Sequence, residues 1–132
     1  MLSVRLMVLG IFAMLLLAAC KTEYFGGEPA SDAHAERDLA RAVKIYEEGD
    51  YPAAIAMLQH AIQYGLSNRV DHANAYKYLA FIYCTSAREK QCRESFKKAL
   101  EINKDFDLQP AEAGHPVWGP VFRSIKGGKS VN

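Results

Sequence analysis

The sequence contains three cysteines and four histidines, the residue types most often used to bind metals and among those that act in catalysis. The histidines are His34, His60, His72 and His115, and they fall in different predicted elements. No pair of them shows ligand spacing with a Cys or a carboxylate. No Ser, Cys or carboxylate lies in a recognisable nucleophile or acid-base motif. The sequence therefore predicts no metal site, no cofactor and no enzymatic activity.

Cys20 follows a segment with the features of a secretory signal. Arg5 is the only charge in residues 1–19, and residues 6–19 are apolar apart from one glycine. This apolar run is shorter than the ~20 residues that span a bilayer. Residues 17–20, Leu-Ala-Ala-Cys, resemble the bacterial lipobox, which implies cleavage before an acylated cysteine. We expect a lipoprotein signal peptide and a covalent lipid on Cys20; the alternative is an incidental cysteine at the end of a membrane anchor.

Residues 20–31 are expected to form a lipidated flexible linker, because they show no hydrophobic period and include Gly26, Gly27 and Pro29. Each buried methylene of an acyl chain contributes about 0.8 kcal/mol, so two or three chains hold a protein in a bilayer. Lys21 stands where an Asp would resemble a signal for retention in the inner membrane. We therefore expect a membrane lipoprotein that faces the periplasm, in the outer membrane rather than the inner one.

The charge balance of the mature chain excludes some function classes. Removing Arg5 leaves 15 basic and 15 acidic residues, a net charge of zero. Proteins that bind nucleic acids by neutralising phosphates present an excess of cations, so we expect no nucleic-acid partner and no polybasic membrane sensor. About 100 residues suffice for one core but leave little room for a second domain or a deep site for a small molecule.

Residues 32–126 are predicted to form an all-α domain. Helix-favouring residues dominate from residue 32 to about 103, with interruptions at 49–52, at 65–71 and near 85–86. This pattern predicts four helices of 13 to 18 residues.

Several residues are typical of helix ends. Asp50 can cap the second helix, Gly65 can end it, and residues 86–89 are typical of a capping box that opens the fourth.

The tail is predicted to cover the end of the helical domain. It contains the single Trp and three prolines, which forbid one long helix. We expect a short turn at 111–113 and then a helix from about Pro116 or Pro120 to Lys126 that docks on the fourth helix. Residues 127–132 are expected to be a disordered tail.

Self-comparison indicates a duplicated unit. At an offset of 38 residues, Ala54 aligns with Cys92, Leu58 with Phe96 and Ala61 with Ala99. The second unit, Tyr-x2-Leu-Ala-x2-Tyr from residue 76 followed by Cys-x3-Phe-x2-Ala from residue 92, resembles the tetratricopeptide repeat. The resemblance implies two helical hairpins, four helices in all, plus a C-terminal capping helix. The alternative is a generic amphipathic four-helix bundle.

Cys84 and Cys92 bracket the predicted turn between the third and fourth helices. Antiparallel helices bring such a pair into contact, and an exported protein meets oxidising conditions. We expect a disulfide, which would add about 2.5 kcal/mol of stability by the loop-entropy estimate. The alternative is two buried free thiols that act as small packing residues.

The first helices of stacked hairpins line the concave side, which makes their outward residues the candidates for partner binding. These candidates are Leu39, Val43, Lys77, Tyr78 and Phe81. Tyr78 and Phe81 are the expected anchors, because aromatic side chains bury a large area at small entropic cost; the alternative is that both complete the core. Two repeats offer a short groove suited to a peptide or a helix of ~10 residues.

The two hairpins differ in charge. Residues 28–64 carry seven acidic and three basic residues, whereas residues 85–104 carry six basic and three acidic ones. Such a separation can orient a domain against a partner; the alternative is that both are solvated faces.

Four features together resemble the TssQ-type lipoproteins associated with type VI secretion. They are the lipobox, the two repeat-like units, the spacing of Cys84 and Cys92, and the tail from Leu108 to Phe122, with its His-Pro-x-Trp-Gly-Pro-Val-Phe run. The resemblance implies an accessory role at an envelope-spanning secretion apparatus, with one of its subunits as protein partner and no catalytic residues. A pilotin-like or outer-membrane assembly lipoprotein is the alternative, and an envelope enzyme is disfavoured.

Overall fold

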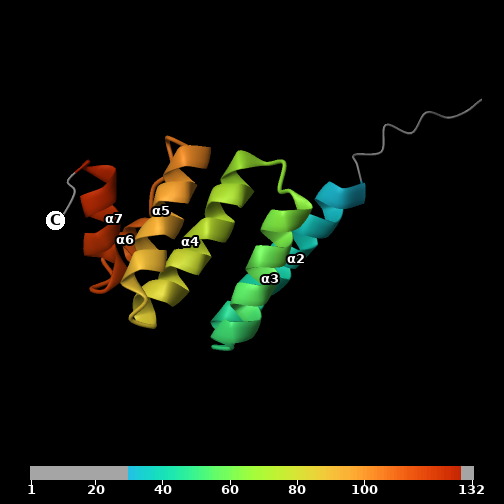
Figure 1. Cartoon of the computed structure of the whole chain (residues 1–132), viewed down its shortest axis with the longest axis horizontal. Coiled ribbons are helices and arrows are strands. Elements are labelled where there is room, and N and C mark those ends of the chain that lie inside the picture. Colours follow the sequence, from blue (N-terminus) through green and yellow to red (C-terminus); the bar gives the residue numbers. More distant parts are fainter. Residues whose placement is uncertain (1–29, 129–132) are drawn as a thin grey trace, which may run out of the picture.

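The computed structural model describes residues 30–128, all of whose regular elements are helices (Figure 1). The helices are α2 (Ala30–Glu47), α3 (Tyr51–Tyr64), α4 (Arg69–Thr85), α5 (Glu89–Ile102), α6 (Pro110–Ala113) and α7 (Trp118–Lys126). The predicted all-α architecture is confirmed: two helical hairpins, α2/α3 and α4/α5, are followed by C-terminal helices. The predicted signal peptide 1–19, the predicted lipidation site Cys20, residues 21–29 of the predicted linker and the tail residues 129–132 lie outside the described residues.

α2 begins at Ala30, inside the segment 20–31 that we expected to be linker. Pro29 is the last helix breaker before the Ala-rich sequence, so no residue after it opposes helix formation. The predicted boundary is therefore two residues too late.

The expected helix ends around α3 are confirmed. The backbone N–H of Ala53 donates to the Asp50 carboxylate at 3.2 Å, so Asp50 caps α3. Gly65 ends the helix with φ at +94°, a conformation that residues with a Cβ rarely adopt.

The expected capping box at residues 86–89 is wrong. α5 begins only at Glu89, and no side chain caps its first turn. Ala87 has φ at +58°, and this left-handed turn leaves Ser86 at the end of α4, where its N–H donates to the Ile82 carbonyl at 3.0 Å. The Glu89 carboxylate instead accepts a hydrogen bond from Arg93 at 3.0 Å.

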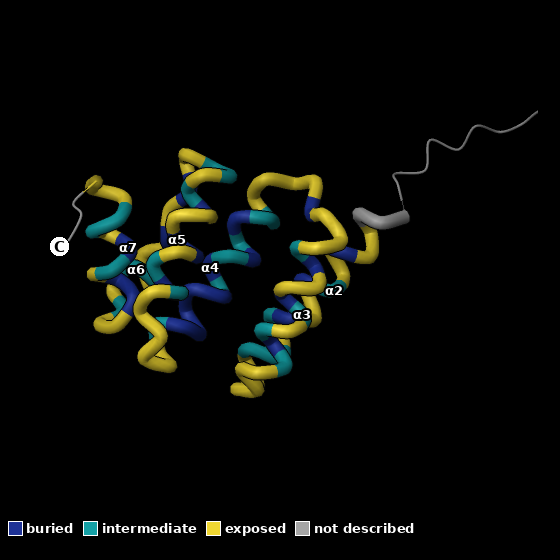
Figure 2. Tube along the Cα trace, viewed as in Figure 1, coloured by how far each residue is buried: buried dark blue, intermediate teal, exposed yellow. Residues whose placement is uncertain are grey.

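α4 is the central helix of the stack. It contacts α2, α3, α5 and α7, and Figure 2 shows its trace largely buried. The positions that align at the offset of 38 residues are fully buried in both hairpins. These aligned pairs are Ala54 and Cys92, Leu58 and Phe96, and Ala61 and Ala99. Cys84 of α4 and Cys92 of α5 form a disulfide, with their Cα atoms 5.1 Å apart.

The C-terminal segment covers the α4/α5 hairpin, as expected. Phe122 of α7 packs edge-on against Phe96 of α5, with ring centroids 5.1 Å apart. Trp118 stacks on Phe81 of α4 at 4.2 Å. α7 begins at Trp118, between the two prolines from which we expected it to start. The apolar face of the second hairpin is thereby buried.

Replacing Gly119 with Ala is expected to destabilise the domain by about 1–3 kcal/mol, because a Cβ there would collide with the Ala113 carbonyl oxygen and crowd Arg123. Urea unfolding measures the change. Gly114→Ala is the matched control, since its Cβ would lie at an ordinary 3.6 Å from the Pro110 carbonyl oxygen. Equal stability of the two variants would contradict this packing.

Within residues 30–128, no helix has the length and apolar character needed to cross a membrane.

Candidate binding groove

A groove of about 420 Å³ lies between the first helices of the two hairpins. We call it the α2/α4 groove. Its lining residues are Glu36, Leu39, Ala40 and Val43 from α2, Asp71, Asn74, Lys77 and Tyr78 from α4, and Gln109 from the segment before α6. The volume falls in the range of ordinary ligand sites. Ala40 is exposed and Val43 and Tyr78 are half-buried, so the groove offers some apolar surface that a partner can reach.

Four of the five predicted partner-binding residues line this groove: Leu39, Val43, Lys77 and Tyr78. The fifth, Phe81, is only 2% exposed and lies beneath Trp118. Phe81 therefore completes the core, as the alternative for this residue held. Tyr78 remains as the aromatic side chain that a partner can contact.

Lys77 is buried at the edge of the groove, with 7% of its surface exposed. Its ammonium group donates to the Glu112 carboxylate at 2.7 Å and lies 4.7 Å from the centre of the Tyr78 ring. Removing one partner of a buried ion pair leaves the other charge uncompensated, which is strongly destabilising. This pair therefore ties α6 to α4 and fixes one wall of the groove.

Sequence reasoning missed Ala40, Asp71 and Gln109, which line the groove, and Glu112, which bonds to Lys77 at its edge. Glu112 stands 35 residues from Lys77, and no periodicity links them. A local signal does exist, because the Gln109 N–H donates to the Glu112 carboxylate at 3.0 Å, and Gln-x-x-Glu is a capping pattern. That pattern predicts the turn but not the contact with α4.

The groove lies in acidic surroundings. Burial raises the pKa of Tyr78, and the nearby carboxylates of Glu112 and Glu47 raise it further. Burial also raises the pKa of Tyr46, whose ring meets that of Tyr78 edge-on at 5.2 Å. Glu36 and Asp71 add negative charge to the rim, whereas Lys77 is neutralised by Glu112. The rim therefore favours positively charged groups on a partner.

The histidines lie on separate elements. His60 of α3 bonds to Asp38 of α2 at 2.8 Å, which links the two helices of the first hairpin. His115 stacks on Trp118 with ring centroids 3.3 Å apart. Among residues 30–128, no three His, Cys, Asp or Glu side chains gather as metal ligands would.

Acid is expected to destabilise the domain partly through His72. Burial lowers the pKa of His72 below its ordinary value of 6.5, so the unfolded chain binds the proton more tightly than the folded one. The contribution of neutral His72 to the free energy of unfolding is therefore fully present above pH 6.5, and it is lost as the pH falls through the lowered pKa of the folded state. The change in unfolding free energy between about pH 7.5 and about pH 5.5 should be smaller in His72→Gln than in the wild type. Identical pH profiles would contradict this effect.

Comparison with models of protein families, with curated proteins and with solved structures finds no match to this chain.

Proposed function

We propose that this chain is a membrane-tethered adaptor that binds a protein partner in the α2/α4 groove and catalyses no reaction. The observation that carries the proposal is the groove itself. The first helices of both hairpins line it, it exposes apolar surface at Ala40 and Val43, and Tyr78 is positioned as an anchor. A short groove of this kind suits a peptide or one helix of ~10 residues. Its acidic rim favours a partner segment that carries Lys or Arg.

The tether is the second part of the proposal. The lipobox-like residues 17–20 support acylation of Cys20, and Lys21 supports placement in the outer membrane, facing the periplasm. The linker then keeps the helical domain near the membrane surface, where its partners are proteins of the cell envelope.

The resemblance of the tail and the cysteine spacing to TssQ-type lipoproteins supports an accessory role in type VI secretion, with a subunit of that apparatus as partner. The plan of a lipid followed by helical hairpins also supports the second candidate, a pilotin-like or outer-membrane assembly lipoprotein. Neighbouring genes separate the two: sheath and baseplate genes support secretion, whereas pilus or secretin genes support a pilotin.

Affinity capture of the full-length protein from detergent-solubilised membranes tests the groove. Ala40→Arg places a positive charge in the groove, and Ala56→Arg makes the same change at an exposed position of α3 outside it. We expect an envelope protein, identified by mass spectrometry, to be retained by the wild type and by Ala56→Arg. Ala40→Arg should retain about tenfold less, because the added guanidinium repels the Lys or Arg side chains of the partner segment and its long side chain fills part of the groove. Equal retention by both variants would contradict the proposal.

A further inference from the structure

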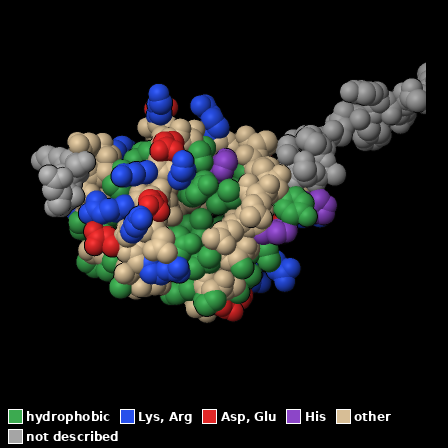
Figure 3. Space-filling model, viewed as in Figure 1, with side chains coloured by type: hydrophobic (Ala, Val, Ile, Leu, Met, Phe, Trp, Pro, Cys, Tyr) green, Lys and Arg blue, Asp and Glu red, His purple; other side chains and the backbone are tan. Residues whose placement is uncertain are grey.

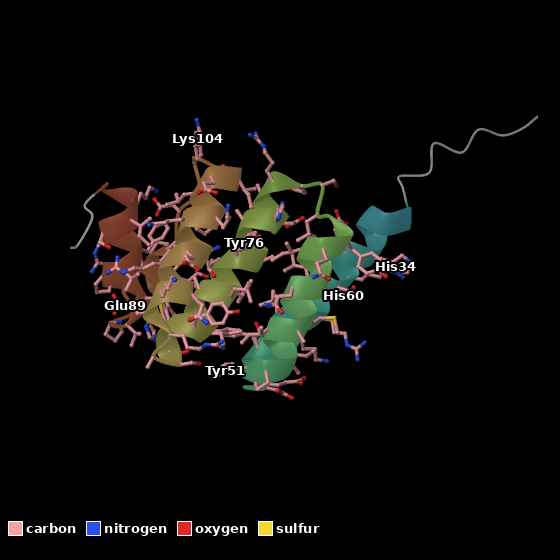
Figure 4. All side chains as sticks on the ribbon, viewed as in Figure 1. His34, Tyr51, His60, Tyr76, Glu89 and Lys104 are labelled. Atoms are coloured by element: carbon pink, nitrogen blue, oxygen red, sulfur yellow. A yellow bond between two sulfur atoms is a disulfide. The ribbon has the colours of Figure 1, made fainter. Side chains whose placement is uncertain are left out.

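The opposite face of α4 carries a second groove, of about 520 Å³. We call it the α3/α5 groove. α3 and α5 both contact α4, but among the described helices they do not contact each other, so side chains of α4 form the floor: Tyr76, Leu79 and Tyr83. Figure 3 shows hydrophobic side chains at the centre of this face, and Figure 4 labels Tyr76 on α4 beside α3. No residue lines both grooves, so the two sites are separate.

Ser95 of α5 offers a hydroxyl to this groove. The residue lines the groove, yet only 6% of its surface is exposed. Within residues 30–128 the hydroxyl forms no hydrogen bond to another residue, whereas no fully enclosed side-chain N or O atom lacks such a partner. The Ser95 hydroxyl therefore opens on the groove. Because a polar group that is largely removed from water is costly when it stays unpaired, this hydroxyl favours a ligand that bonds to it.

The α3/α5 groove carries no net charge. Glu94 and Lys98 are the charged residues among those that line it. Just outside the lining, Glu101 accepts from the Lys98 ammonium at 2.8 Å, and Arg88 donates to the Gln91 amide, with its oxygen toward Arg88, at 3.0 and 3.2 Å. Positive and negative groups are thus balanced both within the groove and beside it. An uncharged ligand therefore fits the groove better than an anion or a cation.

The groove presents three carboxamides and little aliphatic surface. The carboxamides belong to Gln59 and Gln63 on α3 and to Gln91 on α5, and a carboxamide both donates and accepts hydrogen bonds. Ile62 and Leu79 are the aliphatic residues of the lining, so the large apolar side chains of a peptide, or an acyl chain, would bury little surface there. The groove therefore favours a ligand that is polar along most of its edge.

A sugar ring has the properties that this lining selects. It is uncharged, and the hydroxyls around its edge both donate and accept hydrogen bonds. Its faces carry C–H groups, which pack on aromatic and aliphatic side chains. The floor offers the half-buried ring of Tyr76 and the side chain of Leu79 for such packing. The volume of about 520 Å³ lies in the range of ordinary ligand sites.

We propose that the α3/α5 groove binds an uncharged oligosaccharide. One face of a sugar ring packs on Tyr76 and Leu79, and its hydroxyls bond to the glutamines of the walls and to Ser95. This site goes beyond the proposed function, because it gives the chain a carbohydrate ligand while the α2/α4 groove holds a protein.

A glycan array tests the proposal with fluorescently labelled full-length protein, in a detergent that has no sugar headgroup. The array carries neutral glycans together with anionic ones, and an uncharged peptide of alternating Ser and Val is printed beside them. We expect binding to neutral glycans in preference to anionic ones and to the peptide. Isothermal titration calorimetry then measures the affinity for the neutral oligosaccharide that binds. Sedimentation with insoluble cell-wall glycan, with this oligosaccharide as competitor, distinguishes a polymer strand from a free sugar as the ligand.

Ser95→Ala should weaken binding of the oligosaccharide about fivefold, because one hydrogen bond is lost. Its urea unfolding should match that of the wild type, since the Ser95 hydroxyl has no partner to lose among the described residues. Ser86→Ala is the matched control, because it makes the same change at an exposed residue outside the groove, and it should bind as the wild type does.

Gln63→Ala, at an exposed position of α3, should also weaken binding, and it keeps the test valid if Ser95→Ala folds poorly. Absence of binding to every neutral glycan overturns the proposal, as does equal binding of anionic glycans or binding of the peptide alone. Equal affinities of Ser95→Ala, Gln63→Ala and Ser86→Ala also overturn it, because the sugar would then bind elsewhere.

Discussion

Replacing Trp118 with Ala is expected to lower the free energy of unfolding by about 3–5 kcal/mol, a large share of the stability of a domain of this size. The Trp118 ring is 8% exposed and stacks on Phe81 at 4.2 Å. Its indole N–H donates to the Glu112 carbonyl at 2.9 Å. The substitution therefore removes aromatic packing, opens a cavity over α4 and leaves the Glu112 carbonyl without this donor.

Urea unfolding, followed by circular dichroism, measures the change. Val117→Ala is the control at the preceding residue, which is 44% exposed, and it should change stability by no more than about 0.5 kcal/mol. Trp118→Phe should fall between the two, since it keeps an aromatic ring but loses the hydrogen bond to Glu112. A Trp118→Ala protein as stable as Val117→Ala would show that the C-terminal segment does not cover the hairpin as described.

Replacing Cys20 with Ser is expected to move the protein from the membrane fraction to the soluble fraction and to abolish its activity in cells, while the helical domain stays folded. The predicted acyl chains would contribute about 0.8 kcal/mol per buried methylene, so two or three of them would far outweigh any contact of a neutral domain with the bilayer. Fractionation with immunoblotting measures the location, and circular dichroism measures the fold.

The double variant Cys84→Ser/Cys92→Ser is the control for this prediction. It removes the other two thiols but leaves Cys20 and the residues before it intact, so it should remain with the membranes. If the Cys20→Ser variant stayed in the membrane fraction, or kept full activity in cells, the proposed lipid tether would be contradicted.

The sequence predicts the bounds of α3 well because both of its ends carry a strong local signal. Asp50 and Gly65 bound α3 as expected, since a carboxylate cap and a positive φ are local requirements. The capping box predicted at residues 86–89 is wrong because Ala87 adopts a left-handed conformation. Nothing in the type of this residue predicts that conformation; the tight connection between α4 and α5 imposes it.

The candidate groove is predictable as far as its helices are periodic. Leu39, Val43 and Tyr78 follow from helical spacing and the order of the hairpins, and they lie together as that order requires. Phe81 is buried because the Trp118 ring stacks on it, and Trp118 lies far from Phe81 in the sequence. Lys77 is likewise buried in an ion pair with Glu112, which is also distant in the sequence. The helical spacing of residues in the sequence could therefore not predict either contact.

Site-specific photo-crosslinking in cells tests the central claim most directly, namely that a partner protein occupies the α2/α4 groove while the chain is tethered to the membrane. A benzophenone amino acid at Ala40 reports on the groove, and the same amino acid at Ala56 reports on exposed surface outside it. We predict one discrete adduct at position 40 with an envelope protein, lost when Cys20 is replaced by Ser and absent at position 56. No adduct at position 40, or the same adducts at both positions, would contradict the account.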